Sequence, residues 1–399
     1  MTHDTHYRAT ARQWLAAHAL DFSGAARRGL SLAEDVALGR AWQALKARHG
    51  YAAVNLPAHY GGGGGSELDK IIFSEEELKY DLPTVYYSIS LSNPLPIFLR
   101  YASDAFKERL APAAIRGEHI WCQLFSEPAA GSDLAALRLR AERVDNGWRL
   151  NGQKLWTSWA QLADWGVVIA RSDPSLPKHA GLTYFFLDMH SPGITVRPVR
   201  RLVGHPDLNE VWFDNVLIPD EQRLGEVNGG FKVAVETLMI ERYGVTDETA
   251  DSPPLEAFVE LARGARLNGR PALLDGEVRL AIAKAFVERQ GLRSIHSRAM
   301  AAIAAGCEPG PEGAIRKLLI GRTRQQLGAL AMDLLGLEAL RLPADSLSSR
   351  DFTHAWLDPS VRIAGGTDEI LLNTLAERVL GLPQDHRPDK GLPFNTVPR

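Results

Sequence analysis

Apolar residues recur with helical spacing along the first third of the chain. In the segment 33–51, Val36, Trp42 and Leu45 fall on one side of a helix, and Gly50 ends the pattern. In the segment 66–80, a capping serine precedes a second stretch whose apolar residues again share one side. This periodicity predicts an all-helical domain over residues 1–118.

The pattern changes at about residue 119, where short apolar runs are separated by Gly, Pro and Asp. Asn146-Gly147 stands between two such runs, and this dipeptide is a strong signal for a β-hairpin. Further strand-like runs follow at roughly regular spacing. They predict a middle domain, residues 119–225, that is all β and forms a barrel or a sandwich.

Helical periodicity returns at about residue 226 and predicts a C-terminal helical domain over 226–385. The domain contains long amphipathic stretches, the last of which ends at Gly381 and Pro383. The Pro- and Asp-rich segment 247–254 and the tail 386–399 are predicted to be loops.

Composition narrows the range of functions. The chain has 399 residues and a formal net charge of −3 with no basic stripe, so we expect no nucleic-acid partner. It contains no apolar run of about eighteen residues, so we expect no membrane span. Cys122 and Cys307 form no C-x-x-C pair, which argues against a disulfide framework or a zinc site and favours a cytoplasmic protein.

Two segments rich in small residues invite functional interpretations. Residues 61–65 are consecutive glycines, but Ser-Glu-Leu follows them instead of the Gly-Lys-Ser/Thr of a phosphate-binding loop, so we predict a flexible connector. Residues 126–133 read Ser-Glu-Pro-Ala-Ala-Gly-Ser-Asp. Such a segment is either a tight turn or a loop that lays its N–H groups and hydroxyls along a flat ligand.

Five segments resemble the acyl-CoA dehydrogenases: CQLFSEPAAGSD, NGWRLNGQKLWTSW, SPGITVRPV, NEVWFDNVLIP and IAGGTDEI. Their order and spacing match over roughly residues 5–383, most closely to bacterial enzymes that act on steroid side chains and other branched or ring-bearing acyl-CoAs. The resemblance implies an α+β fold. It consists of a helical N-terminal domain, a middle β-barrel or sandwich domain and a C-terminal four-helix bundle.

The resemblance implies FAD as the cofactor and gives the segment 126–133 a role. Gln123, Phe125 and Ser126 would contact the flavin ring, and Ser132 would reach the pantetheine arm of the acyl-CoA. Fixed N–H and O–H donors there would stabilise the negative charge that hydride transfer places on the flavin.

The segment KLWTSW is implied to form a second flavin wall. Trp156 matches the family's stacking tryptophan, and Ser158 matches the hydroxyl that addresses the hydride-accepting nitrogen. Taken without the first motif, a strand tryptophan would be interpreted as a core residue. At the family spacing behind the segment 126–133, the flavin interpretation is favoured.

The turn GGTDEI is implied to bind the FAD phosphate and adenine through Gly366, Thr367 and Glu369. A glycine-rich turn that opens a helix offers free N–H groups to an anion. Two departures from the family pattern are visible. Leu371-Leu372 replaces a Gln-Arg pair, and the segment 263–271, RGARLNGRP, lacks the Phe-Gly that follows an arginine reaching a neighbouring subunit's FAD.

Dehydrogenation requires a carboxylate base for the weakly acidic α-proton, in a dry pocket that raises the base's pKa. The commonest family pattern places this glutamate two residues before the threonine of the turn, but the residue here is Gly365. A second pattern takes it from a Leu-x-x-Glu-Arg stretch, which LMIER at 238–242 matches. Glu241 is therefore predicted as the base and Arg242 as a residue near the thioester; the alternative is a solvated Glu-Arg pair.

The predicted function is FAD-dependent α,β-dehydrogenation of an acyl-CoA to a 2,3-enoyl-CoA, with electrons passed to an electron-transfer flavoprotein. Two alternatives remain open: a flavin oxidase or monooxygenase on the same fold, and a non-catalytic subunit of a mixed oligomer. The resemblance and the apolar C-terminal helices predict a homodimer or homotetramer, or a heterotetramer with a homologue.

Overall fold

The computed structural model describes residues 3–204, 207–243, 253–307, 310, 313–340 and 352–397. The chain divides into two compact units. The first comprises Met1–Arg201, His205–Gly244 and Asp385–Arg399, and the second comprises Leu202–Gly204 and Val245–Gln384.

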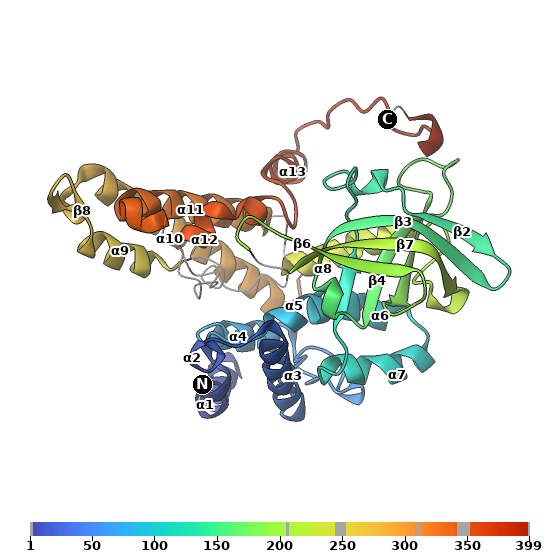
Figure 1. Cartoon of the computed structure of the whole chain (residues 1–399), viewed down its shortest axis with the longest axis horizontal. Helices are drawn as coiled ribbons and strands as arrows, with labels where there is room; N and C mark the ends of the chain where they lie inside the picture. Colours follow the sequence, from blue (N-terminus) through green and yellow to red (C-terminus); the bar gives the residue numbers. More distant parts are fainter. Residues whose placement is uncertain are drawn as a thin grey trace. The chain divides into compact units, whose positions relative to one another are not determined.

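The first unit begins with a helical part, as predicted. Its α-helices start where capping residues stand: Ser31 and Ser66 each accept the N–H of the third residue of the following helix in a capping box. Tryptophan, leucine and phenylalanine side chains of these helices form a core around Trp42. The helices are α1 His3–His18, α2 Gly24–Arg27, α3 Leu32–Arg48, α4 Glu67–Glu77, α5 Val85–Ser92, α6 Pro94–Tyr101 and α7 Asp104–Ile115 (Figure 1).

The glycine run 61–65 is a connector, but it is not the loosely tethered one that we predicted. Gly63, Gly64 and Gly65 donate backbone hydrogen bonds to Ala53, Leu56 and Val54. A Cβ atom on Gly63 would lie 2.4 Å from the carbonyl oxygen of Gly50. Glycine is needed here because the backbone passes so close to its neighbour.

One seven-stranded sheet forms the middle of the first unit (Figure 1). Its strand order is β1-β4-β2-β3-β7-β6, and β5 pairs with β4. The predicted hairpin joins β2 to β3, with Val144 opposite Gly147. The strands are β1 Trp121–Leu124, β2 Arg140–Val144, β3 Gly147–Ser158, β4 Trp165–Arg171, β5 Leu182–Asp188, β6 Ile194–Val199 and β7 Leu208–Pro219.

Both faces of strands β4 and β5 are buried, which explains their continuous apolar runs. One face of β4 and β5 packs with helices α6, α7 and α8 (Gly230–Tyr243) in a core that contains Phe98, Trp121 and Phe186. The opposite face packs with residues of β3 and β7, among them Leu150 and Phe213. Strands β4 and β5 are thereby covered on both faces.

The second unit is helical and has its own core around Phe258 and Ala331. Sequence periodicity predicted its long helices but missed α9, α12 and a two-stranded hairpin. Of the predicted loop 247–254, residues 247–252 lie outside the described residues. The elements are α9 Leu255–Gly264, β8 Arg266–Leu267, β9 Arg270–Pro271, α10 Gly276–Ala304, α11 Gly313–Leu335, α12 Phe352–Leu357 and α13 Asp368–Thr374.

Candidate functional site

The loop that follows β1 opens with a tight turn. Glu127 and Ala130 exchange backbone hydrogen bonds of 3.0 Å in both directions. Phe125, just before the turn, is buried, and Ser126 is half-buried. Ser132, beyond the turn, is exposed. The segment is therefore both a turn and a surface loop, and the two interpretations of its sequence are compatible.

A buried ion pair fixes this loop to strand β3. The Lys154 ammonium is fully buried and donates to the Glu127 carboxylate at 2.8 Å and to the Phe125 carbonyl at 2.9 Å. The same carboxylate accepts the backbone N–H groups of Arg138 and Leu139. Burial lowers the pKa of Lys154, and Glu127 opposes that shift. Glu127 thus closes both ends of the loop and holds it to the strand.

Strand β3 is irregular just where the second flavin wall was predicted. Its pairing with β7 shifts register between Lys154 and Thr157, as in a β-bulge. At this bulge Trp156 has a φ of 63°, an unusual conformation for a bulky residue, and its side chain is 53% exposed. The bulge therefore turns an indole ring toward solvent instead of into the core.

The bulge also joins the two predicted walls. Leu155 donates its backbone N–H to the Ser126 carbonyl at 2.8 Å. Ser158, at the end of the strand, is half-buried, as is Gln123, whose side-chain oxygen accepts a hydrogen bond from Asn93 at 2.9 Å. The structure thus brings together Ser126 and the strand that carries Trp156, although about thirty residues separate them.

The turn GGTDEI lies in the second unit. Gly365 and Gly366 have φ values of 66° and 108°, and Thr367 caps α13 by accepting the Ile370 N–H at 3.3 Å. Lys317 donates to the Gly366 carbonyl. Glu369 is exposed. A side chain at Gly365 would be strained, so this position suits glycine and would hold a glutamate only at a cost.

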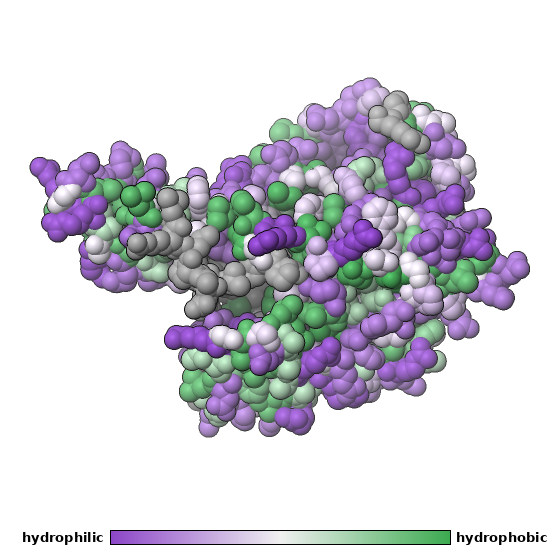
Figure 2. Space-filling model, in the orientation of Figure 1, coloured by the Kyte–Doolittle hydropathy of each residue, from purple (hydrophilic) through white to green (hydrophobic). Residues whose placement is uncertain are grey.

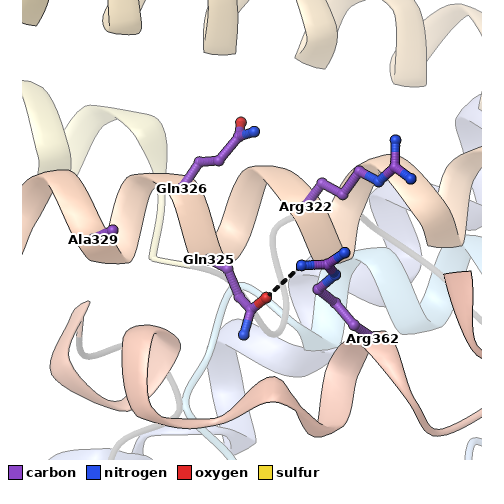
Figure 3. Close-up of a pocket in the computed structure, with 5 residues that line it drawn as sticks. All are labelled: Arg322, Gln325, Gln326, Ala329 and Arg362. Carbon is purple, nitrogen blue, oxygen red and sulfur yellow. Dashed lines mark hydrogen bonds between the residues drawn. The ribbon is translucent and has the colours of Figure 1, made fainter.

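An open pocket bordered by arginine and glutamine side chains in the same unit was missed by the sequence analysis (Figure 3). Arg322, Gln325, Gln326 and Ala329 of α11 line it together with Arg362. Arg362 donates to Gln325 at 3.1 Å, and both arginines donate to Asp368, the residue after Thr367. The signal was present in the sequence, because the four α11 residues follow the spacing i, i+3, i+4, i+7 of one helix face.

Two other predicted features can be located only in part. Glu241 and Arg242 belong to the last turn of α8, but their side chains lie outside the described residues. The segment 263–271 forms the end of α9 and a hairpin, where Asn268 and Gly269 take positive φ values in the turn. Arg263 at its start pairs with Glu260.

Three family models match consecutive parts of the chain. They are the N-terminal domain of acyl-CoA dehydrogenase at residues 2–118, its middle domain at 122–216 and its C-terminal domain at 228–380. Among the residues that the structure describes, no helix is both long and apolar enough to cross a membrane.

Individual relatives agree with these models. Acyl-CoA dehydrogenase FadE34 of Mycobacterium tuberculosis is 40% identical over 348 residues, which cover 86% of this chain and 46% of FadE34. The chain therefore spans about half the length of that relative. Acyl-CoA dehydrogenase IpdE1 of the same organism is 33% identical over 352 residues, covering 87% of this chain and 88% of IpdE1. The solved ChsE4-ChsE5 complex from M. tuberculosis superimposes with a TM-score of 0.78 at 26% identity, covering 96% of this chain and 99% of that chain.

The helical part, the middle sheet and the C-terminal helical part follow one another along the chain in the same order as the three matched dehydrogenase domains. The chain belongs to the acyl-CoA dehydrogenase family. The predicted fold class is confirmed. Members of the family are FAD-dependent oxidoreductases that act on acyl-CoA, so the predicted enzyme class and cofactor are confirmed at the level of the family. The roles of individual site residues stay predictions.

Proposed function

We propose that this chain catalyses the α,β-dehydrogenation of an acyl-CoA thioester to the 2,3-enoyl-CoA, with Glu241 as the base that removes the α-proton. The observation that carries the proposal is the junction of the two predicted flavin walls, where Leu155 donates to Ser126 beside the buried Lys154–Glu127 pair. FAD, when bound, supplies the hydride acceptor. The junction fits a flat ring because it combines the exposed indole of Trp156 with the half-buried hydroxyl groups of Ser126 and Ser158.

In this proposal the residues of the junction bind and orient. Trp156 covers the face of the ring, while Gln123 and Phe125 line its edge. The hydroxyls of Ser126 and Ser158 donate hydrogen bonds to the ring. Because the backbone on both sides is held by the sheet, these donors need no reorganisation when negative charge develops.

Gly366, Thr367 and Glu369 are proposed to hold the adenine and phosphate end of FAD. The Thr367 hydroxyl oxygen already accepts the N–H of Ile370, so toward a ligand this group has its proton to offer. Gly366 has no side chain of its own to cover its backbone N–H group.

The proposed substrate is a branched or ring-bearing acyl-CoA. Glycine at position 365 leaves room where the commonest family pattern has a glutamate, and a bulkier acyl group can use that room. Ser132 and Arg242 are proposed to contact the pantetheine arm and the thioester end. An electron-transfer flavoprotein is the proposed electron acceptor.

An anaerobic titration of the purified protein with a panel of acyl-CoAs tests the function. The flavin absorption should bleach with at least one acyl-CoA, and Glu241→Gln should slow this reduction by about two to four orders of magnitude while FAD and acyl-CoA still bind. Glu236→Gln is a matched control, because it is the same change on the same helix and its carboxylate is occupied by Tyr101 at 2.7 Å.

Other outcomes would replace the proposal. Reduction of Glu241→Gln at the wild-type rate would place the base elsewhere. Oxygen consumption coupled to turnover would indicate an oxidase or monooxygenase. A protein that retains no FAD would favour the alternative of a non-catalytic subunit that needs a partner chain; the structural neighbour ChsE4-ChsE5 is itself a complex.

A further inference from the structure

The last described residues of the chain fold back onto the first unit. Within Asp385–Arg399, Phe394 and Asn395 donate backbone hydrogen bonds to Leu176 and Pro174 at 2.9 and 3.0 Å. Pro393 forms a β-bridge with Pro177. This tail was predicted to be a loop. In the structure it contacts the connection between β4 and β5.

Lys178 links this tail to the loop of the candidate site. Its ammonium is 2.7 Å from the Asp389 carboxylate of the tail and 2.8 Å from the Asp133 carboxylate. Asp133 directly follows Ser132, the residue proposed to contact the pantetheine arm. Lys178 is only 9% exposed and the Asp389 side chain 23%, so their ion pair is shielded from water more than a typical surface pair, whereas the Asp133 side chain is 54% exposed.

A second connection runs through Arg171. The Phe394 ring centroid lies 3.9 Å from the Arg171 guanidinium carbon, within the range of a cation–π contact. Arg171 is 3% exposed and donates to the carbonyls of Lys178 and Ala135. Ala135 lies in the short 3-10 helix that ends the loop, so the tail contacts reach the loop at two points on either side of Leu134.

We propose that residues 385–397 are a strap that positions the Ser132–Asp133 part of the loop for acyl-CoA, with Lys178 as the positioning residue. The inference rests on the proposed function. With the strap docked, the loop is ordered before the substrate arrives. Without it, the loop has to be ordered on binding, and the cost appears as weaker affinity for the acyl-CoA. The flavin walls do not depend on the strap, because the Lys154–Glu127 pair holds them.

Two variants test the strap. Asp389→Asn removes one carboxylate from Lys178, and truncation after Gln384 removes the whole segment. Each should raise the Kd and KM for acyl-CoA about tenfold, while FAD occupancy and the rate of flavin reduction at saturating acyl-CoA stay at wild-type values. Asp389→Glu should restore most of the affinity. Asp385→Asn is the matched control, because the side chain of Asp385 is exposed in the same segment.

Hydrogen exchange separates this inference from the proposed function. Backbone amides of residues 131–136 should exchange faster in Asp389→Asn than in the wild-type holoenzyme, whether or not an acyl-CoA bleaches the flavin. Failure of every acyl-CoA to bleach the wild-type protein would refute the proposed function. Unchanged exchange, or unchanged affinity for a bleaching acyl-CoA, would refute the strap. If the truncated chain does not fold, the hydrogen exchange and the acyl-CoA affinity of Asp389→Asn test the strap without it.

Discussion

The Lys154–Glu127 pair is the residue-scale feature on which the candidate site depends. Lys154→Met would leave the Glu127 carboxylate buried without its cation, and removal of one partner of a buried pair costs about 3–5 kcal/mol of unfolding free energy. The same variant should lose FAD during purification, because the loop is no longer tied to β3. Urea unfolding and the flavin-to-protein absorbance ratio measure the two effects.

Lys232→Met serves as the control for this change, since the Lys232 side chain is exposed and its loss should alter stability by less than about 0.5 kcal/mol. A similarly small effect of Lys154→Met, with normal flavin content, would contradict the role of the pair.

At the residue scale, motif spacing pointed to the segments of Ser126 and Trp156, whose roles stay predictions, but it gave no access to contacts that depend only on proximity in space. Trp156 and Ser126 were predicted from motifs, and the structure places their segments together. The Glu127–Lys154 contact was not predicted, because lysine and glutamate are almost always surface residues and these two are far apart in sequence. The resemblance favoured a Trp156 that faces a ligand instead of the core, but the bulge that exposes it could not be predicted, since it arises from pairing with β7.

At the scale of elements, one carboxylate takes part in several of the polar contacts between α1 and α4. Glu76 of α4 accepts hydrogen bonds from Arg8 at 2.8 Å and Arg12 at 2.7 Å. Burial opposes ionisation of this carboxyl, but the bonds from Arg12, Lys79 and Arg8 outweigh it and lower the pKa of Glu76 to about 2. The folded-state pKa lies below the usual value of about 4.3, so the stabilisation is present above that pH and is lost as pH falls toward 2.

We therefore expect Glu76→Gln to lower the melting temperature at pH 6 and the difference from wild type to shrink as pH falls from 5 to 2.5. Differential scanning calorimetry across this range measures it. Glu108→Gln, an exposed carboxylate of α7, should show almost no difference at either end. A gap for Glu76→Gln that stays constant with pH would show that ionisation of Glu76 does not carry the effect.

Elements with long uniform periodicity were predicted well, and short or interrupted ones were not. Helices α10 and α11 extend over many turns, so the helical period of their apolar residues stands out despite single residues that do not fit it. Helix α12 has six residues, too few for a period to emerge. The last predicted helix divides into α13 and a π-helix at Leu375–Val379, a change of hydrogen bonding that leaves no mark in the apolar pattern. Strand order also escaped prediction, because it depends on distant pairings.

At the scale of the whole molecule, the second unit exposes large apolar side chains that a partner could cover. Green patches mark part of this surface on the C-terminal helices in Figure 2. In this unit Leu337 is 82% exposed, Val287 67% and Phe286 53%. Exposed apolar surface of this kind is typical of oligomer interfaces.

Light scattering should therefore give about two or four times the chain mass of 43.8 kDa at micromolar concentration. Phe286→Glu together with Val287→Glu, on the exposed face of α10, should lower that mass if this face lies in the interface. A wild-type mass near 43.8 kDa would contradict an oligomer that forms from this chain alone. If adding a homologous chain then raised the mass to about four chains, the result would indicate a heterotetramer.

Trp156 has a left-handed backbone conformation. Selection for stability and selection for FAD binding would therefore favour different residues at this position. Glycine or asparagine would occupy a φ of 63° with far less strain and would also remove an apolar ring from water. Both changes favour the apoprotein, yet both delete the surface proposed to cover the flavin. A thermal screen run without FAD would therefore rank such replacements as improvements, while natural selection on turnover would discard them. Engineering of this enzyme for heat resistance should score bound flavin at every round and treat position 156 as fixed.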